Sequence, residues 1–362
     1  MAVSAEAPAV TPTDQAVARL TTVVVSYNGQ AEIGACLEAL LVNGLRPEQV
    51  LVFDNASSDR TLDIVREEFP GVRIVASDVN LGYGEAINRA AKLSRSEFMA
   101  VINQDAIAQR GWTEALLRVL EEHPDAGLVT AKVLLQDDPA YVNAAGNSPH
   151  FTGITPCRGF GAPSADFTRV EDVPAISGCA FAFRRSLLLE LGGFDGDFFL
   201  YFEDTDLSLR MQLAGYRCLL VPDAQVLHDF EPRFSAAKLR LLERNRLTSW
   251  LKLFRWRTLL LLAPAMLLTE VVSTGFAVLT GPRAVAARLR GVGEVFRGLS
   301  AILAARRQVQ ATRRIGDREL LGRLDASLDI GEMDHGLGGA AMAAVNPLYR
   351  TCYRVALSAI RW

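Results

Sequence analysis

The chain has 362 residues, half of them hydrophobic, and a formal net charge of −3 at pH 7. This length allows one large or two modest domains with a sizeable hydrophobic core. Five cysteines are scattered without a CxxC pair, which argues against a zinc site or a disulfide framework and favours a reducing compartment. Residues 1–18 are rich in Ala, Thr and Pro and do not resemble a secretory signal, so they predict a disordered tail.

Charge is distributed unevenly along the chain. Residues 233–320 contain 17 Lys/Arg against 5 Asp/Glu, whereas the rest of the chain is acidic. Such an asymmetry indicates an anionic partner for the basic part, either a membrane or a nucleic acid. We expect a membrane surface and no nucleic acid, because the basic part contains a long apolar run and no recognised nucleic-acid-binding motif.

The first hundred residues alternate between buried strands and helices. Apolar or β-branched runs predict strands at 21–28 (with the following loop), 50–53, 72–75 and 98–102, and helical apolar spacing predicts helices at 31–42, 61–69 and 85–93. Alternation of this kind builds βαβ units. We therefore expect an α/β fold, Rossmann-like, with a mostly parallel central sheet.

Polar residues follow each predicted strand at its carboxyl end. They are Tyr27 and Asn28, Asp54 and Asn55, Asn80 and Gly82, and Asp105. The carboxyl ends of parallel strands meet at one edge of a sheet, where open α/β sheets bind their ligands. These side chains are therefore expected to converge on one ligand. The glycine loop at 80–84 lacks the third glycine of GxGxxG, so a dinucleotide-binding oxidoreductase is weakly supported.

The pattern after Asp105 is less regular. It predicts helices at 112–122, 185–191 and 205–213, and strands at 127–135, 175–183, 217–221 and 224–227. Residues 137–172 form a long stretch rich in Gly and Pro, and loops of this length are usually functional. Gly178 lies inside one predicted strand, the pair Glu203-Asp204 precedes a helix, and His228 ends the last strand.

Taken in order, these motifs resemble a known family. The motifs are Asp54-Asn55-Ala56-Ser57-Ser58-Asp59, Asn80-Leu81-Gly82-Tyr83-Gly84, Asn103-Gln104-Asp105, Ser177-Gly178-Cys179-Ala180, Gly193-Phe194-Asp195, Glu203-Asp204-Thr205-Asp206-Leu207 and His228. Together they resemble the family 2 glycosyltransferases of the GT-A fold, especially bacterial rhamnosyltransferases that build cell-wall linkers or O-antigens. The resemblance covers about residues 20–235.

The resemblance implies that a nucleotide sugar binds at the sheet edge. Asp54 would accept a hydrogen bond from the imide N–H of a uracil or thymine ring, a role that suits a carboxylate; its alternative is a turn or helix cap. Further nucleotide-sugar contacts are expected from Tyr27, Asn28, Asn80, Gly82, Asn88, Asn103 and Gln104. An ordinary turn at 80–82 and helix packing at Asn88 are the alternatives there. Asn55 and Ser57 are expected to cap the next helix.

Asp105 takes the place of the last acid in the family's DxD metal-binding motif. The first acid is missing, because position 103 is Asn103. Mg²⁺ keeps several waters and needs only one or two carboxylates beside phosphates, so a single Asp can suffice. His228 resembles a histidine that completes the metal shell in some members, and imidazole suits Mn²⁺ better than Mg²⁺. The expected cofactor is Mg²⁺ or Mn²⁺, with a structural His228 as the alternative.

Asp204 is expected to be the catalytic base. An inverting transfer needs a group that takes the proton from the attacking hydroxyl, and the resemblance assigns this role to the Asp of Glu203-Asp204. Neighbouring acids, among them Asp206, would raise its pKa, and Arg210 is expected to pair with these acids. The alternative is an ordinary acidic helix N-terminus. Gly178 and Glu203 are placed on the acceptor side, with packing as the alternative for Gly178.

The basic C-terminal part is expected to attach to a membrane. Basic residues lie on both sides of the apolar run at 258–280: Arg244, Arg246, Lys252, Arg255 and Arg257 before it, and Arg283, Arg288, Arg290, Arg297, Arg306 and Arg307 after it. Two basic flanks conflict with a single crossing. Interfacial helices or a re-entrant hairpin are therefore preferred to a span, and a soluble helical domain is the third alternative. Residues 346–362 predict an amphipathic helix for docking or homo-oligomerisation.

These inferences divide the chain into a disordered tail at 1–18, a GT-A domain at 19–235, a helical membrane-associating region at 236–325, and a tail at 326–362 with an amphipathic helix. The predicted activity is inverting, metal-dependent transfer of a sugar, foremost L-rhamnose from dTDP-rhamnose, to a lipid-linked saccharide. We expect a peripheral or monotopic enzyme at the cytoplasmic face of the bacterial inner membrane.

Two rival functions stay open at this point. The nearer one is a transferase of the same family that uses a UDP-hexose. The rival from another class is a non-catalytic membrane scaffold, which would have no need of Asp105 or Asp204. Processive polysaccharide synthesis is disfavoured, because the QxxRW signature is absent from the chain.

Overall fold

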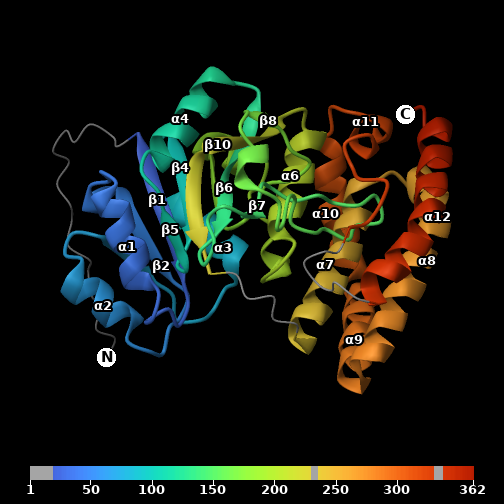
Figure 1. Ribbon diagram of the computed structural model, residues 1–362, viewed down its shortest axis with the longest axis horizontal. Helices are drawn as coiled ribbons and strands as arrows, with labels where there is room; N and C mark the ends of the chain where they lie inside the picture. Colours follow the sequence, from blue (N-terminus) through green and yellow to red (C-terminus); the bar gives the residue numbers. More distant parts are fainter. Residues whose placement is uncertain (1–18, 230–234, 330–336) are drawn as a thin grey trace, which may run out of the picture.

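The computed structural model describes residues 19–229, 235–329 and 337–362. The disordered tail expected at 1–18 lies outside the described residues. Figure 1 shows a sheet with helices on both faces, coloured blue to yellow, beside a group of helices coloured orange to red. The first part contains the sheet, and the second part contains the basic C-terminal region.

The first four strands form the parallel half of the sheet. They are β1 (Leu20–Ser26), β2 (Val50–Asp54), β3 (Arg73–Ala76) and β4 (Phe98–Asn103), in the order β3-β2-β1-β4. The helices between them are α1 (Ile33–Val42), α2 (Thr61–Glu68) and α3 (Tyr83–Leu93). The predicted α/β fold is therefore confirmed, with element ends within two residues of those predicted.

The second half of the sheet is mixed. Its strands are β5 (Ala106–Ala108), β6 (Ala126–Leu135), β7 (Val142–Ala144), β8 (Glu171–Asp172), β9 (Ala180–Arg184) and β10 (Arg217–His228). β9 lies antiparallel between β4 and β6, and β10 runs parallel to β6. An uninterrupted parallel arrangement thus holds for the first four strands, and the second half mixes the parallel pair β6–β10 with antiparallel pairs, because the βαβ alternation stops after β4. The two strands predicted at 217–221 and 224–227 form one strand, β10, with a shift in its pairing after Val221.

Helices cover both faces of the sheet. Beside α1 to α3, they are α4 (Trp112–Glu122), α5 (Arg185–Glu190) and α6 (Glu203–Leu213), with short 3-10 turns η1 (Pro47–Gln49), η2 (Ser164–Asp166) and η3 (Gly196–Phe198). Alternate residues of a strand face opposite sides: Val24 packs in one cluster with α1 and α4, and Val23 in another with α3, α5 and α6. The core therefore has two layers, and α6 lies on the same side as α3.

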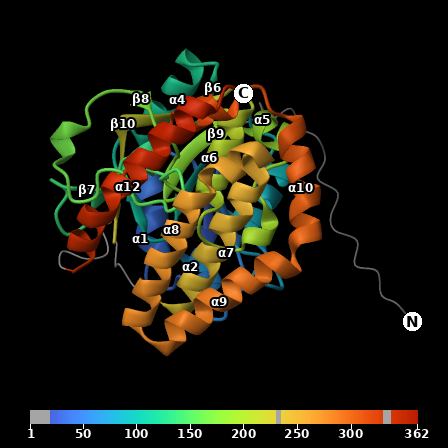
Figure 2. The same ribbon diagram turned by 90° about the vertical axis from the view of Figure 1, so that its right-hand side faces the viewer.

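The described residues of the C-terminal region, 235–329 and 337–362, form six helices. They are α7 (Ala236–Leu253), α8 (Trp256–Thr280), α9 (Pro282–Arg297), α10 (Leu299–Ala311), α11 (Asp317–Leu321) and α12 (Leu337–Ala359). Figure 2 shows α8, α9, α10 and α12 on the side that faces away from the sheet, with α7 behind them. A third hydrophobic cluster joins this region to the part of the chain that contains the sheet, through Phe151, Phe198, Trp250 and Tyr349.

Four basic residues expected to flank a membrane segment are instead buried, three of them in ion pairs. Arg246 pairs with Glu270 at 2.5 Å, and Arg288 pairs with the same carboxylate. Lys252 is 1% exposed and Arg306 is 8% exposed. The membrane-facing prediction is therefore wrong for these four residues, because a buried charge is stable only with a partner. Composition counts charges but does not show which of them are paired inside the protein.

Candidate active site

The ends of three parallel strands lie level at one edge of the sheet. Ser26 at the end of β1 pairs with Asp54 at the end of β2, and Val25 pairs with Asn103 at the end of β4. The residues that follow, Tyr27 and Asp105, therefore belong to the same edge. This edge is where an open α/β sheet binds a ligand, as the sequence predicts.

Asp54 is buried and has one carboxylate oxygen in use. Its Oδ2 accepts a hydrogen bond from the backbone N–H of Ser57 at 3.0 Å. Its Oδ1 is buried and accepts no hydrogen bond from the described residues. A buried acceptor without a donor is costly, so Oδ1 fits a donor supplied by a ligand, such as the imide N–H of a pyrimidine base.

The loop after β1 is locked to the loop after β2. Asn28 has a left-handed backbone, and its side-chain Oδ1 accepts a hydrogen bond from the N–H of Ser58 at 2.8 Å. Ser57 accepts a hydrogen bond from the N–H of Asn28 and so does not cap α2, contrary to the prediction. Asp59 supports the start of that helix through the N–H of Thr61. Tyr27 is half exposed, which leaves its ring available at the sheet edge.

The glycine loop before α3 is held tightly. Asn55 donates to the carbonyl of Gly82 at 3.0 Å and accepts from the N–H of Leu81, so it clamps this loop instead of capping α2. Asn80 Oδ1 accepts from the N–H of Gly82. Gly82 has φ +81°, and a Cβ there would lie 2.2 Å from the carbonyl oxygen of Phe199. Only glycine fits this position.

Three predicted contact residues hold the framework of the site. Asn88 accepts from the N–H of Phe194 at 2.8 Å and donates to its carbonyl at 2.9 Å. Gln104 Oε1 accepts from the N–H of Tyr27 at 3.0 Å. The N–H of Asn103 donates to the carbonyl of Cys179. The amide side chains of Asn88 and Gln104 are thus engaged within the protein, and their direct contact with a ligand stays a prediction.

Asp105 and His228 lie together, as predicted, although they are far apart in the sequence. Nε2 of His228 is 3.4 Å from Oδ1 of Asp105, and Nδ1 of His228 is hydrogen-bonded to Oδ1 of Asn143 at 2.9 Å. Oδ1 of Asp105 is buried and accepts no hydrogen bond from the described residues. A metal-binding imidazole is held in this way, with its second nitrogen fixed by a neighbouring acceptor. The pair therefore fits a divalent cation with one oxygen and one nitrogen ligand. The described residues contain no cluster of three or more such ligands.

Asp204, at the start of α6, is held by four donors, one of which is the hydroxyl of Thr205 at 3.3 Å. Its Oδ2 accepts from the N–H of Gly178 and from Nδ2 of Asn147, both at 2.9 Å, and its Oδ1 accepts from the N–H of Thr205 at 2.6 Å. Burial raises the pKa of Asp204, and these hydrogen bonds act in the opposite direction. A fixed carboxylate with a raised pKa is suited to take a proton.

Gly178 lies in the turn before β9, so its predicted place inside a strand is wrong. β9 begins at Ala180, because the chain must turn for the N–H of Gly178 to reach Asp204. A Cβ at Gly178 would lie 3.2 Å from Oδ2 of Asp204. The residue therefore lies beside the candidate base, which is consistent with its predicted place on the acceptor side.

Tyr83 joins the two sides of the site. Its hydroxyl donates to the carbonyl of Gly178 at 2.6 Å. Burial raises the pKa of Tyr83 well above its usual value, and the nearby negative charges of Glu203, Asp204 and Asp105 add to the effect. Through Gly178, Tyr83 is therefore linked to the segment that holds Asp204.

Glu203 is buried next to Asp204. Burial, with a contribution from the charge of Asp204, raises the pKa of Glu203 to about 8. Its Oε2 accepts no hydrogen bond from the described residues. A protonated Glu203 can donate a hydrogen bond at neutral pH, and an ionised Asp204 can accept one, so the adjacent acids differ in chemistry.

The segment before Glu203 has an unusual backbone. Phe199, Tyr201 and Phe202 all have positive φ values, between 63° and 74°. Such conformations are costly for non-glycine residues and persist only where the surroundings enforce them. Asn245 of α7, fully buried, donates to the carbonyls of Leu200 at 3.0 Å and Tyr201 at 2.7 Å, and also to that of Phe198. Helix α7 therefore fixes the segment that leads into the candidate base.

The third acid of the motif has a structural role. Asp206 is buried, lies 2.7 Å from Arg210 and 2.9 Å from Lys252, and accepts a hydrogen bond from Ser249. Although burial acts to raise it, the positive charges of Lys252 and Arg210 lower the pKa of Asp206 to about 2. The predicted pairing of Arg210 with the acidic motif is confirmed for Asp206. The ion pair between Asp206 and Lys252 joins α6 to α7, so we assign Asp206 to the framework of the site and not to the reaction.

Three residues in this site escaped the sequence analysis. Tyr83, Asn147 and Asn245 each act through hydrogen bonds to distant segments. The long stretch at 137–172 was a signal for Asn147, because loops of that length are usually functional. Tyr83 belongs to the motif at residues 80–84, where the sequence predicts a role for Asn80 and Gly82. The sequence pattern of α7 gives no sign that Asn245 has a special role.

Residues 18–247 match the family described as Glycosyltransferase like family 2. The match extends over more than half of the chain and includes the whole sheet edge and the start of α6. The chain therefore belongs to the family 2 glycosyltransferases, which confirms the resemblance seen in the sequence and makes the protein a transferase.

Two proteins with similar sequences have named activities. The chain is 32% identical over 232 residues to the N-acetylglucosaminyl-diphospho-decaprenol L-rhamnosyltransferase of Mycobacterium tuberculosis, a match that covers 58% of this chain and 75% of that protein. It is 27% identical over 233 residues to the glucosyl-dolichyl phosphate glucuronosyltransferase of Haloferax volcanii, covering 59% and 71%. A moderately close rhamnosyltransferase is thus among its relatives.

Solved structures share the fold. S. aureus TarS 1–349 in complex with UDP-GlcNAc has a TM-score of 0.52 at 15% identity, covering 93% of this chain and 90% of that one. GalNAc-T7 with UDP, GalNAc and Mn²⁺ has a TM-score of 0.54 at 14% identity, covering 65% and 48%. At these identities the likeness concerns the fold alone, and it confirms the GT-A architecture.

Proposed function

We propose that this protein is an inverting glycosyltransferase that moves L-rhamnose from dTDP-rhamnose to a lipid-linked saccharide. The observation that carries the proposal is the placement of Asp204, whose carboxylate is held by Gly178 and Asn147 next to the buried acid Glu203. The 32%-identical rhamnosyltransferase supports the choice of sugar and of a lipid-diphosphate acceptor.

The reaction places the acceptor hydroxyl between Asp204 and the donor sugar. Asp204 takes the proton of that hydroxyl while its oxygen forms a bond to the anomeric carbon. The bond from the anomeric carbon to the nucleoside diphosphate breaks on the opposite face, and the diphosphate leaves with the electron pair. Configuration at the anomeric carbon is therefore inverted. The raised pKa of Asp204 favours the proton transfer.

The nucleotide lies along the sheet edge in this proposal. Oδ1 of Asp54 accepts from the imide N–H of the base, and the loop from Asn80 to Gly82 lies against the ribose and phosphates. Asp105 and His228 would hold Mg²⁺ or Mn²⁺, which neutralises negative charge on the diphosphate when bound. Glu203, held protonated by burial, donates a hydrogen bond on the acceptor side.

A lipid-linked acceptor implies that the enzyme works at a membrane. A lipid-linked saccharide has its diphosphate at the membrane surface, so the protein works at the cytoplasmic face of the membrane. The exposed apolar residues of α8 support this location. A UDP-hexose in place of dTDP-rhamnose would use the same residues, because uracil and thymine present the same imide donor to Asp54.

A panel of sugar nucleotides tests the proposal. We expect dTDP-rhamnose to raise the unfolding temperature more than UDP-glucose, UDP-GlcNAc or GDP-mannose, and Mn²⁺ to enlarge the shift. Radiolabel from dTDP-rhamnose should then appear in the lipid fraction of membranes that contain the protein. Transfer from a UDP-hexose but not from dTDP-rhamnose would identify the UDP-hexose as the donor. Absence of transfer from every sugar nucleotide would favour a non-catalytic membrane scaffold.

A further inference from the structure

We propose that α8 and α9 lie in one leaflet of a bilayer that contains anionic phospholipid, parallel to its surface, and that α8 does not cross the membrane. The inference deepens the membrane location in the proposed function. It assigns the membrane contact to a surface formed by α8 and α9, and it gives the orientation of α8 in the lipid. The surface and the orientation do not depend on which sugar is transferred.

Helix α8 has two apolar faces, and only one of them is covered by protein. Among the described residues it is the one helix long and apolar enough to span a membrane, by length and composition. Thr258, Leu262, Ala265 and Thr269 form a buried stripe. Leu260, Leu267, Val271 and Val278 form an exposed stripe and are between 61% and 76% exposed. Both stripes follow the repeat of a helix. An exposed apolar stripe of this length marks a surface that another apolar phase covers.

The buried face of α8 is fastened to the protein by polar contacts. Glu270, near the middle of the helix, pairs with Arg246 of α7 at 2.5 Å and with Arg288 of α9. Thr269 shares a hydrogen bond with the hydroxyl of Tyr349 in α12 at 2.9 Å. A crossing would break these contacts or carry the three charged side chains to the bilayer centre, where charge is unfavourable. Helix α8 is therefore fixed on the side of the protein.

Helix α9 supplies the charges that select an anionic surface. Its outer face alternates between basic and apolar residues, with Arg283, Leu289, Arg290, Phe296 and Arg297 all exposed. Leu289 is 63% and Phe296 is 73% exposed. Helices of this composition lie in the membrane interface, with apolar side chains in the acyl region and guanidinium groups at the phosphates. The alternation therefore favours a phospholipid surface over an apolar protein partner.

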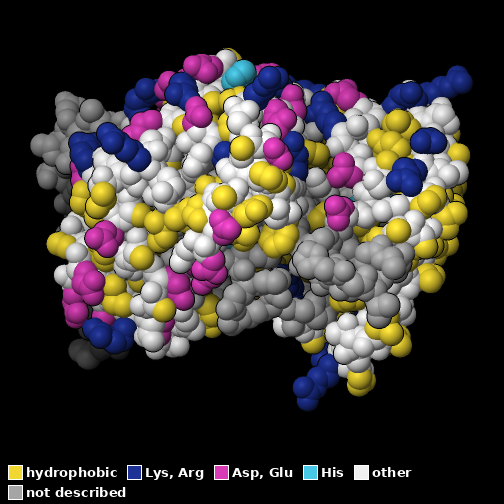
Figure 3. Space-filling view, viewed as in Figure 1, with side chains coloured by type: hydrophobic (Ala, Val, Ile, Leu, Met, Phe, Trp, Pro, Cys, Tyr) yellow, Lys and Arg dark blue, Asp and Glu magenta, His cyan; other side chains and the backbone are white. Residues whose placement is uncertain are grey.

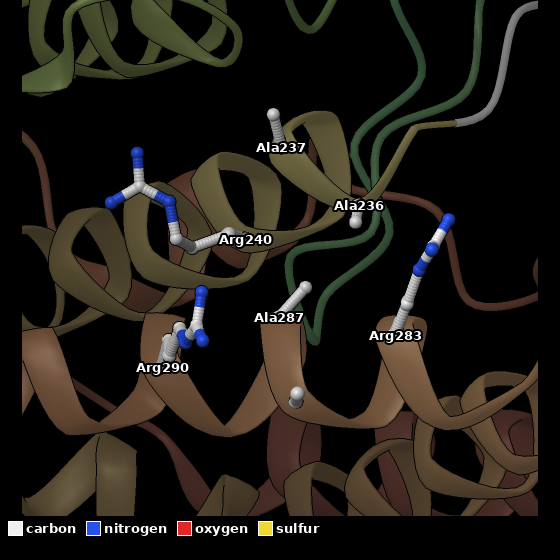
Figure 4. Close-up of a pocket in the computed structure, with 7 residues that line it drawn as sticks. Ala236, Ala237, Arg240, Arg283, Ala287 and Arg290 are labelled. Carbon is white, nitrogen blue, oxygen red and sulfur yellow. The ribbon is translucent and has the colours of Figure 1, made fainter.

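A basic hollow lies at the edge of this surface. It has a volume of about 360 Å³ and is lined by Arg240 of α7 and by Arg283, Ala287 and Arg290 of α9 (Figure 4). The wall of the hollow is mainly apolar, and the guanidinium of Arg240 is paired with Glu294 at 2.6 Å. Arg283 and Arg290 are exposed beside it, where their N–H groups can meet the phosphates of an anionic lipid. Hydrophobic side chains also gather along the right-hand edge of the space-filling view, over α8 and α12 (Figure 3). Both features extend the same contact surface.

Vesicle flotation of the full chain tests the surface. We expect the protein to float with vesicles of phosphatidylglycerol and phosphatidylcholine and to bind vesicles of phosphatidylcholine alone at least tenfold more weakly. The double variant Leu267→Asp with Val271→Asp should lose at least tenfold in binding to the mixed vesicles. Val42→Asp is the matched control, because Val42 is 78% exposed on α1 and should leave binding unchanged. Circular dichroism and nucleotide-induced thermal shifts, expected to match wild type, separate lost binding from lost folding.

Labelling of both ends of α8 tests its orientation. Arg257→Cys and Thr280→Cys should each react with a membrane-impermeant maleimide added outside the vesicles, with the labelled peptides identified by mass spectrometry. Protection of one end would show a span and overturn the proposal. Equal flotation of wild type and the double variant would also overturn it, as would a stable dimer that the double variant abolishes, because a second copy would then cover the stripe. Nucleotide binding without vesicle binding would reject this surface and leave the transfer reaction intact.

Discussion

Nε2 of His228 lies 3.4 Å from Oδ1 of Asp105, across two strands that pair antiparallel. The pairing of β5 with β10 sets His228 opposite Ala106, next to Asp105. The family's metal motif has two acids in one short segment, and here the first of them is Asn103. The sheet therefore brings from β10 a candidate ligand, His228, to the place where the local sequence lacks an acid.

Removal of the imidazole should weaken metal binding. We expect His228→Ala to raise the Mn²⁺ concentration for half-maximal transfer at least tenfold, because one of two protein ligands is lost. Transfer measured against Mn²⁺ concentration checks this. His123→Ala, at the end of α4, is the control and should behave as wild type. Identical metal titrations for His228→Ala and wild type, or full activity in excess EDTA, would reject the site.

Gly82→Ala should disturb the glycine loop through a steric contact. A Cβ there would meet the carbonyl of Phe199, whereas Gly44 has a comparable φ of +97° with nothing within 4 Å. Gly44→Ala should cost about 1 kcal/mol of unfolding free energy from backbone strain alone. Gly82→Ala should cost about 3 kcal/mol and abolish the nucleotide-induced thermal shift. Urea unfolding of both variants separates the two effects, and equal losses would contradict the steric account.

Asn245 should control turnover through the segment before Glu203. In Asn245→Ala the carbonyls of Leu200 and Tyr201 lose a donor, which should lower kcat by about 10- to 100-fold with a smaller change in the KM for the nucleotide sugar. Ser249→Ala is the matched control, since it removes a buried hydrogen bond between α7 and Asp206 without touching that segment. A purely structural role would lower the stability of both variants equally and leave kcat unchanged in both.

Glu203 should make the stability of the protein depend on pH. Burial raises its pKa to about 8, above the usual carboxyl range of about 4 to 4.5. Between those values the folded state keeps a proton that the unfolded state releases, so unfolding free energy falls as pH rises through this window. Glu203→Gln should flatten the decline, measured by urea unfolding at pH 5 and pH 8. Glu190→Gln, an exposed acid on α5, should leave it unchanged, and an unaltered decline in Glu203→Gln would contradict the account.

The sequence predicts the first four strands and their helices closely, because hydrophobic periodicity is a local property. It also predicts which residues meet at the sheet edge, since parallel strands end together. It does not predict that β9 enters antiparallel between β4 and β6. An apolar segment such as 180–184 pairs equally well in either direction, and the choice depends on chain segments far away.

The same limit applies to the site. The roles proposed for Asp105 and Asp204 rest on motifs, whereas Asn147 and Asn245 act through contacts with distant segments that no local pattern records. The position of Gly178 illustrates the point: its run of small and apolar neighbours is typical of a strand, but its N–H is needed by Asp204. Arg246 and Lys252 count as surface charge in the composition and are buried in the fold.

The most direct test of the central claim is the transfer rate of Asp204→Asn. Asparagine has the same shape but cannot take a proton, so transfer of radiolabelled rhamnose to the membrane acceptor should fall at least 100-fold. The thermal shift caused by dTDP-rhamnose should stay as in wild type, because Asp204 is not placed on the nucleotide. Transfer by Asp204→Asn at the rate of wild type would contradict the assignment of Asp204 as the base.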